Sequence, residues 1–252
     1  MVDRDTLVQF ADDLLQTETF RDIALNGLQI EGANTIQQLT IAVSCNQQTI
    51  DAAVADGSQA ILVHHGLVLN GQVGDIRGAV RRRLKGILCN DINLIGYHLP
   101  LDGHPEVGNN ARLANALDLE IAEPLDTYGP PAIGYLCTPT QRTTVDDLAS
   151  RLRSVTGQDV ITLPGGVRNI DRVAVLCGSG APALEEAAAK NCQALVTGDA
   201  REPTMAMARE LGVTVLVGGH EATERLGVQA LAERMSQEFG ISYRFVADPN
   251  PL

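Results

Sequence analysis

Ile41-Ala-Val-Ser-Cys45 begins the pattern that decides the fold, because a helical stretch, Gln48–Ala55, and a second apolar run, Ala60-Ile-Leu-Val63, follow it. Short apolar runs joined by a helix of this length are typical of parallel strands connected by a β-α-β crossover. The same pattern recurs later in the chain as Val173-Ala-Val-Leu-Cys177, Pro182–Lys190 and Ala194-Leu-Val-Thr197. In both copies another helix and a third strand follow. The sequence therefore predicts a duplicated β-α-β-α-β unit.

We predict an α/β protein of two linked α/β domains, each containing one copy of the unit and a mostly parallel sheet, with a metal site between the domains. The stretch Glu123–Pro131 is the predicted boundary, since its prolines and glycine interrupt regular structure. The first domain would comprise residues 1–127, with residues 220–252 packing back on it as a final helix and strand. Residues 128–219 would form the second domain.

Four of the five histidines fall into three short clusters that follow predicted strands: His64-His65, His98-x-x-x-Asp102 and His220-x-x-x-Glu224. Ligand groups in parallel sheets gather at the carboxyl ends of strands. Imidazole and carboxylate are the side chains that divalent transition metals bind. The duplication aligns the last two clusters, and the four-residue spacing places both side chains of each on one face of a helical turn. The sequence therefore predicts a site for two metal ions.

Each cluster alone has a structural alternative. His64 and His65 could satisfy backbone carbonyls at a strand end, His220 and Glu224 could belong to a helix cap, and Asp102 precedes a glycine as in ordinary turns. The presence of all three clusters favours the metal site. His98 could be a ligand, a residue that orients a ligand, or a proton carrier.

Three loops leave further alternatives open. The turn at residues 178–180, Gly-Ser-Gly, follows a strand and precedes a helix, so it could be a plain tight turn or a phosphate cradle of backbone N–H groups. Asp199 occupies the position in the second copy that corresponds to the histidine pair, and could line the same cleft. His104 precedes Pro105 and could lie in a surface loop or contact a substrate.

Composition excludes several classes of protein. Asp and Glu number 31 against 19 Lys and Arg, and the formal charge of −12 argues against nucleic-acid binding. The basic run Arg81–Arg83 is typical of a solvated helix face. Five scattered cysteines without a C-x-x-C pair predict neither a disulfide framework nor a zinc knuckle. No signal peptide or membrane span is evident, so we expect a cytoplasmic protein without membrane association.

Several motifs together resemble the Nif-three-like dinuclear metal-centre family, whose members are often described as GTP cyclohydrolase I type 2 homologues. They are Asn26-Gly-Leu-Gln29, Val63-His-His-Gly66, Gly96-Tyr-His-Leu-Pro-Leu-Asp-Gly-His104, Gly108-Asn-Asn-Ala-Arg-Leu-Ala114, Thr197-Gly-Asp199 and Gly219-His-Glu-Ala-Thr-Glu224. The resemblance implies two linked α/β domains with a site between them and a ring-shaped homohexamer. It also implies that His64 and Asp102 bind one ion, His65 and His220 bind the other, and Glu224 bridges both.

The chain departs from the family pattern after Thr197-Gly-Asp199, where many relatives have a further histidine and this chain has Arg201-Glu-Pro203. Any catalytic role of that histidine is therefore in doubt here. The chain also lacks the additional domain that some relatives carry between the two halves.

These observations lead to the hypothesis of a dinuclear-metal-dependent hydrolase that acts on a nucleotide or similar small anionic heterocycle. Two divalent ions per chain, Zn, Fe, Mn or Ni, would activate a hydroxide for attack on an electrophilic carbon. The resemblance implies opening of the GTP ring at C8 with formate release, for which His98 is the expected proton carrier. The alternative is a non-enzymatic metal-binding ring scaffold that recruits or regulates protein partners.

Overall fold

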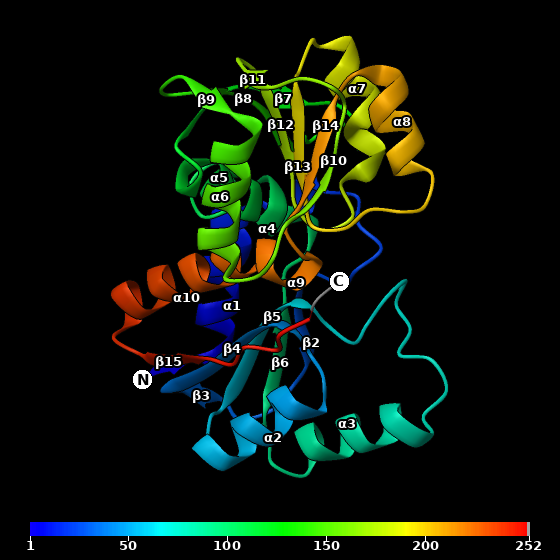
Figure 1. Ribbon diagram of the computed structural model, residues 1–252. Helices are drawn as coiled ribbons and strands as arrows, with labels where there is room; N and C mark the ends of the chain where they lie inside the picture. The colour runs from blue at the N-terminus through cyan, green and yellow to red at the C-terminus, as the bar shows by residue number, and fades with distance from the viewer. Residues whose placement is uncertain (251–252) are drawn as a thin grey trace. The chain divides into compact units, whose positions relative to one another are not determined.

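The computed structural model describes residues 1–250, which fold into two compact units. The first unit consists of Met1–Leu101 and Gly227–Asp248, and the second consists of Asp102–Leu226 with residues 249 and 250. Each unit contains one large sheet with helices packed on it (Figure 1). The mixed α/β class predicted from the sequence is confirmed.

The first unit has a five-stranded sheet in the order β15-β4-β5-β6-β2, in which β15, β4, β5 and β6 run parallel and β2 pairs antiparallel with β6. The strands are β2 (Gly27–Ile30), β4 (Gln38–Ser44), β5 (Ala60–His65), β6 (Asn93–Gly96) and β15 (Ser242–Phe245). The crossover helices are α2 (Gln47–Asp56) and α3 (Gly78–Leu88), and the unit also contains α1 (Arg4–Leu15), most of α10 (Arg225–Phe239), η1 (Thr17–Thr19), β1 (Val2–Asp3) and β3 (Thr35–Ile36).

The core of the first unit follows from strand alternation. Ile61 and Val63 of β5 point to the same face and pack with Ile50 and Ala53 of α2 and with Ile87 of α3, all without solvent exposure. Local signals determine where α2 begins and ends. The Asn46 side chain accepts a hydrogen bond from the Thr49 backbone N–H at its start, and Gly57 ends it in the left-handed conformation.

The second unit has a six-stranded sheet in the order β10-β14-β13-β12-β8-β7. β12, β13 and β14 run parallel, whereas β10, β8 and β7 each pair antiparallel with their inner neighbour. The strands are β7 (Leu119–Leu125), β8 (Gly134–Pro139), β10 (Ile161–Leu163), β12 (Val173–Leu176), β13 (Ala194–Thr197) and β14 (Thr214–Val217). The remaining elements are the end of α4 (Leu99–Gly103), which begins in the first unit, and α5 (Asn109–Ala116), β9 (Thr143–Thr144), α6 (Val145–Thr156), β11 (Asn169–Ile170), η2 (Ala181–Ala183), α7 (Leu184–Ala189), α8 (Thr204–Leu211) and α9 (His220–Thr223).

The predicted duplication is present at the level of strand register. Ala60 of β5 pairs with Leu39 of β4 and Asn93 of β6, and Ala194 of β13 pairs in the same way with Val173 of β12 and Thr214 of β14. The two copies are therefore β4-α2-β5-α3-β6 and β12-α7-β13-α8-β14. The parallel prediction holds for these strands, and the antiparallel strands are additions at the sheet edges.

The passage between the units lies earlier in the chain than the boundary expected at residues 127 and 128. β7, which the sequence analysis placed in the first domain, hydrogen-bonds to β8 in the sheet of the second unit. The proline- and glycine-rich stretch does interrupt regular structure, but it forms the turn between β7 and β8, in which the Gly129 backbone N–H donates to the Asp126 carbonyl (2.8 Å). The same residue types serve in hairpin turns and in linkers, so composition did not distinguish the two.

Candidate metal centre

His64 and His65 lie at the carboxyl end of β5, where the strand stops pairing. The Gln29 side chain ends it, because its Oε1 accepts hydrogen bonds from the backbone N–H groups of Leu67 (2.8 Å) and Val68 (3.1 Å). A Cβ at Gly66 would lie 2.2 Å from that oxygen, so a larger residue at this position would displace the Gln29 side chain from these hydrogen bonds. Consecutive side chains of a regular strand point to opposite faces, but at this strand end the two imidazole centroids are 4.6 Å apart.

His98 completes a group of three imidazoles in the first unit. Its ring centroid lies 5.0 Å from that of His64 and 5.7 Å from that of His65, and one ring nitrogen of each histidine lies within 4.8 Å of the others. The structure therefore brings together all three histidines that the sequence placed after β5 and β6. His64 is buried, whereas the side chain of His98 is 24% exposed.

Each imidazole of this group is oriented by a hydrogen bond at Nδ1. His64 Nδ1 lies 2.8 Å from the Tyr97 carbonyl oxygen, and His65 Nδ1 lies 3.0 Å from the Ser44 hydroxyl oxygen. His98 Nδ1 lies 2.9 Å from Asp22 Oδ1. Metal-binding histidines are held in this way by a carbonyl, hydroxyl or carboxylate at the second ring nitrogen. Nε2 is therefore the ring nitrogen that a metal ion would take.

Asp22 is a buried carboxylate that several donors hold in place. Besides His98 Nδ1, it accepts hydrogen bonds from the backbone N–H groups of Ala24 (3.0 Å) and Leu99 (2.9 Å) and from the Asn26 amide (3.1 Å). Burial alone would raise the pKa of Asp22, but the hydrogen bonds from His98, Ala24 and Asn26 together hold the pKa well below its ordinary value. Asp22 is therefore ionised and fixes the orientation of the His98 ring.

In the second unit, His220 and Glu224 lie beside one another as their spacing predicted. His220 begins α9 and Glu224 directly follows it, and His220 Nε2 lies 3.3 Å from Glu224 Oε2. On the other side of the ring, His220 Nδ1 lies 2.8 Å from Asp199 Oδ2. The hydrogen bond and charge of Glu224, and to a smaller extent those of Asp199, raise the pKa of His220 to about 9, although burial acts in the opposite direction. Two carboxylates thus make this imidazole strongly basic.

The absence of a side chain at Gly178 leaves room for the Glu224 carboxylate. Gly178 has a φ of +56°, and a Cβ built on it would lie 2.1 Å from Glu224 Oε1 and 3.2 Å from His220 Nε2. Two N–H groups of this turn are bound within the protein, since Gly178 donates to the Thr223 hydroxyl (3.3 Å) and Gly180 donates to the Thr197 hydroxyl (2.9 Å). These two donors are therefore already used within the protein, and the turn is packed against Glu224.

Asp102, the remaining predicted ligand, is a buried residue of α4. Its Oδ1 accepts hydrogen bonds from the Asn109 amide (2.9 Å) and from the Cys177 thiol (3.4 Å). Burial is the main cause that raises the pKa of Cys177 well above its ordinary value, and the negative charges of Asp102 and Glu224 add to it. The thiol therefore keeps its proton and donates a hydrogen bond to Asp102, and the charges of both predicted carboxylate ligands act on the pKa of Cys177.

The family of the chain follows from comparison with known proteins. The model of the family Duf34/NIF3 (NGG1p interacting factor 3) matches residues 2–251. The chain belongs to this family. A protein of Pseudomonas aeruginosa named GTP cyclohydrolase 1 type 2 homolog is 39% identical over 249 residues, which are 98% of this chain and 97% of the relative. The resemblance inferred from the motifs is confirmed.

Solved structures of similar proteins share the complete fold. Protein ybgI, described as of unknown function, matches with a TM-score of 0.94 at 36% identity, and TTHA1606 from Thermus thermophilus matches with a TM-score of 0.90 at 32% identity. Both comparisons cover 100% of each chain. Within residues 1–250 of this NIF3-family chain, no helix has the length and apolar character that crossing a bilayer requires.

The side chains present in this NIF3-family chain fit divalent transition metals. Imidazole nitrogen and carboxylate oxygen are donors for Zn, Fe, Mn and Ni, and each imidazole of the first unit is held in place at Nδ1. His104, by contrast, has a structural role, because its Nδ1 accepts hydrogen bonds from the backbone N–H groups of Glu106 and Val107 (both 3.1 Å). Of the two alternatives considered for His104, the loop residue is therefore the better description.

Residues that support the ligands were partly missed by sequence reasoning. Asp22 gave no signal, since it is an isolated aspartate in a loop without periodicity. Cys177 is buried, and its hydrogen bond to Asp102 was not foreseen from the sequence. The one available signal was positional, because Asp199 and Cys177 both follow strands of the second copy, where polar groups at the carboxyl ends gather.

Proposed function

We propose that this NIF3-family protein is a dinuclear-metal-dependent hydrolase of a nucleotide or similar small heterocycle, with GTP as the first substrate to test. The observation that carries the proposal is the group of His64, His65 and His98, whose three rings gather in the first unit with every Nδ1 committed to an orienting partner. Such orientation is a feature of metal-binding histidines. Holding three rings in fixed positions costs side-chain conformational entropy, which metal binding would offset. The names of the full-length relatives support the same reaction class.

The proposed ligands of the two ions are His64, His65, Asp102, His220 and Glu224. When bound, two divalent ions supply Lewis acidity and bring the pKa of water down to about 7. The role of the protein is to hold its donors in a fixed orientation. Asp199 holds the His220 ring at Nδ1, and the Cys177 thiol donates to Asp102, so both ligands have a partner that fixes their direction.

His98 is the proposed proton carrier. Its ring lies 5.0 Å from that of His64, and its side chain is more exposed than that of His64, so a substrate and water can reach it. The ionised Asp22 at Nδ1 orients the ring, which leaves Nε2 as the atom at which a proton can be held. A carboxylate-oriented imidazole of this kind can hand a proton to a leaving group.

Metal stoichiometry and formate release together test the proposal. Protein purified without a histidine tag should contain close to two ions per chain by elemental analysis, and His65→Ala and Glu224→Ala should each contain fewer. His104→Ala is the matched control, because this histidine belongs to a turn and should leave the metal content unchanged. Loading with Zn, Fe, Mn or Ni followed by incubation with GTP should release formate with at least one metal.

The outcomes separate the enzyme from a scaffold. Retention of two ions without turnover of GTP or other nucleotides would favour the alternative of a metal-binding ring that recruits protein partners. Unchanged metal content in both ligand variants would refute the metal centre itself. A homohexamer is part of the same proposal, and light scattering should then give six times the chain mass of 26.8 kDa.

A further inference from the structure

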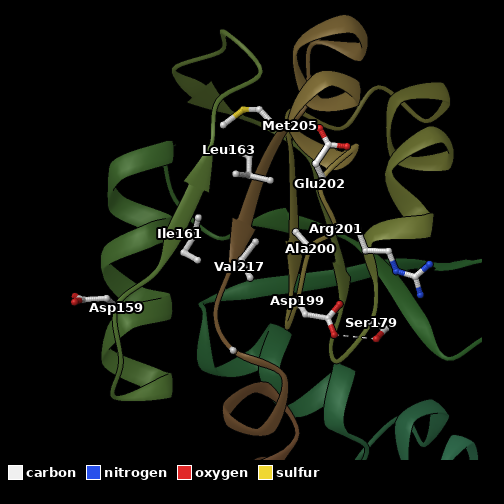
Figure 2. Close-up of a pocket in the computed structure, with 11 residues that line it drawn as sticks. Asp159, Ile161, Leu163, Ser179, Asp199, Ala200, Arg201, Glu202, Met205 and Val217 are labelled. Carbon is white, nitrogen blue, oxygen red and sulfur yellow. Dashed lines mark hydrogen bonds between the residues drawn. The ribbon is translucent and has the colours of Figure 1, made fainter. Parts of the chain in front are cut away.

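A pocket of about 550 Å³ lies in the second unit, next to the residue that orients His220. One edge of the sheet forms a wall, because Ile161 of β10 pairs directly with Val217 of β14, and Leu163 lies two residues further on the same face. The loop after β13 and the first turn of α8, which contains Met205, face this wall (Figure 2). The volume falls within the range of about 300–1,000 Å³ that small-molecule sites have.

The apolar lining suits a flat ring. Ile161 is 55% exposed although it lies in a pocket wall, so part of its aliphatic surface contacts only solvent. Leu163 adds branched carbon surface, and Met205 offers a polarisable thioether, which makes favourable contacts with aromatic rings. A planar heterocycle inserted between β10 and α8 would cover this surface.

The polar groups of the pocket are mainly acceptors. Asp199 and Glu202 both line it, and Asp199 Oδ2 is also bound by the Ser179 hydroxyl (2.9 Å) at the base of the pocket (Figure 2). Arg201 is the only cation among the lining residues, and its side chain is directed away from the apolar wall in Figure 2. Carboxylates accept hydrogen bonds from adjacent N–H groups in bidentate fashion, so the pocket matches a ring with donors on its edge.

The pocket shares a residue, Asp199, with the hydrogen bonds of the proposed ligand His220. The same Asp199 oxygen that receives the Ser179 hydroxyl bond lies 2.8 Å from His220 Nδ1. A ring bound against Asp199 would therefore lie one side chain away from a proposed metal ligand. Asp199 does not line any of the other cavities described within residues 1–250.

We infer that this pocket binds an amino-substituted planar nitrogen heterocycle of the guanine class, with its apolar faces against Ile161, Leu163 and Met205 and its N–H edge on the carboxylate of Glu202 or Asp199. The inference rests on the proposed function for the identity of the reaction, but binding is a separate property. The carboxylates of the pocket select the base, so the ring does not need a phosphate in order to bind.

Calorimetry with the purified full-length protein and three nucleosides tests the inference. Guanosine should bind more tightly than inosine, which lacks the 2-amino donor, by about tenfold or more, because a hydrogen bond to a charged acceptor is lost. Ala200→Phe should abolish guanosine binding, since Ala200 is an exposed residue that lines the pocket, and the larger side chain would fill it without disturbing the core. Adenosine should bind as weakly as inosine.

Matched controls lie on α8. Ala206→Phe adds the same ring at an exposed residue outside the lining and should leave guanosine binding unchanged. Glu202→Gln should reduce the preference for guanosine over inosine, whereas Glu210→Gln, also exposed but outside the pocket, should preserve it. Equal binding of guanosine to Ala200→Phe and to the parent would overturn the inference, as would the absence of binding by any of the three nucleosides.

Formate release measured on the same samples distinguishes the two proposals. If guanosine binding is lost in Ala200→Phe but no metal-loaded sample turns over GTP, the pocket is supported and the hydrolase proposal fails. If GTP is turned over equally by Ala200→Phe and the parent, the hydrolase stands and the pocket assignment fails.

Discussion

Replacement of Gly178 by alanine should impair metal binding far more than it impairs folding. The added methyl would lie 2.1 Å from Glu224 Oε1, whereas ordinary van der Waals contact begins at 3.4 Å, so the carboxylate must retreat by more than an ångström. The φ of +56° adds a backbone cost of about 1–2 kcal/mol for a residue with a Cβ. The oxygen belongs to the end of a side chain that can rotate, so folding loses little beyond this backbone cost.

Metal affinity should fall by about 10–100-fold, the loss usually seen when a ligand is no longer held in position. Isothermal titration of the metal-free protein with Zn²⁺ or Mn²⁺ measures this, and urea unfolding measures the cost to stability. Gly157→Ala is the control, because Gly157 has a φ of +72° and no atom within 4 Å of its would-be Cβ. It should lose the same backbone free energy without any change in metal affinity.

The comparison of these two variants can refute the reasoning. If Gly178→Ala binds metal as tightly as the parent protein does, Glu224 does not need its observed position, and its role as a ligand fails. If both variants lose metal equally, the effect arises from general destabilisation of the second unit. Only a selective loss in Gly178→Ala supports the assignment.

Three further substitutions have defined outcomes. Asp22→Asn should slow formate release by about 10–100-fold with the metal content unchanged, because the His98 ring loses its charged partner; equal rates would exclude the proposed proton carrier. Cys177→Ala should weaken metal binding in a titration, whereas Cys177→Ser, which keeps a donor for Asp102, should preserve it. Thr144→Ala should lower the free energy of unfolding by about 1 kcal/mol in urea, because the capping box of α6 is lost, and should leave metal binding unaffected.

Sequence reasoning succeeded where the signal is local. The runs Ile41–Cys45 and Val173–Cys177 predict buried parallel strands because both faces of such strands are covered, so every residue in them is apolar or small. The spacing of His220 and Glu224 predicted their contact because one helical turn separates them, and the observed distance of 3.3 Å bears this out. In each case the residues that decide the outcome are a few positions apart in the chain.

The features that were missed depend on contacts between distant segments. Asp22 meets His98 across 76 residues of sequence, and the pairing of β10 with β14 that forms the pocket wall joins Ile161 to Val217. An edge strand can pair with either neighbour without any change in its own composition, so β10 alone could not reveal its partner. Composition could not place a domain boundary at residues 127 and 128 for the same reason, since a proline-rich turn has the same composition whether its flanking strands share a sheet or not. The proposed ligand residues of this protein are therefore encoded in short motifs, whereas the residues that orient them, and the pocket lined by Asp199, are defined only by tertiary contacts.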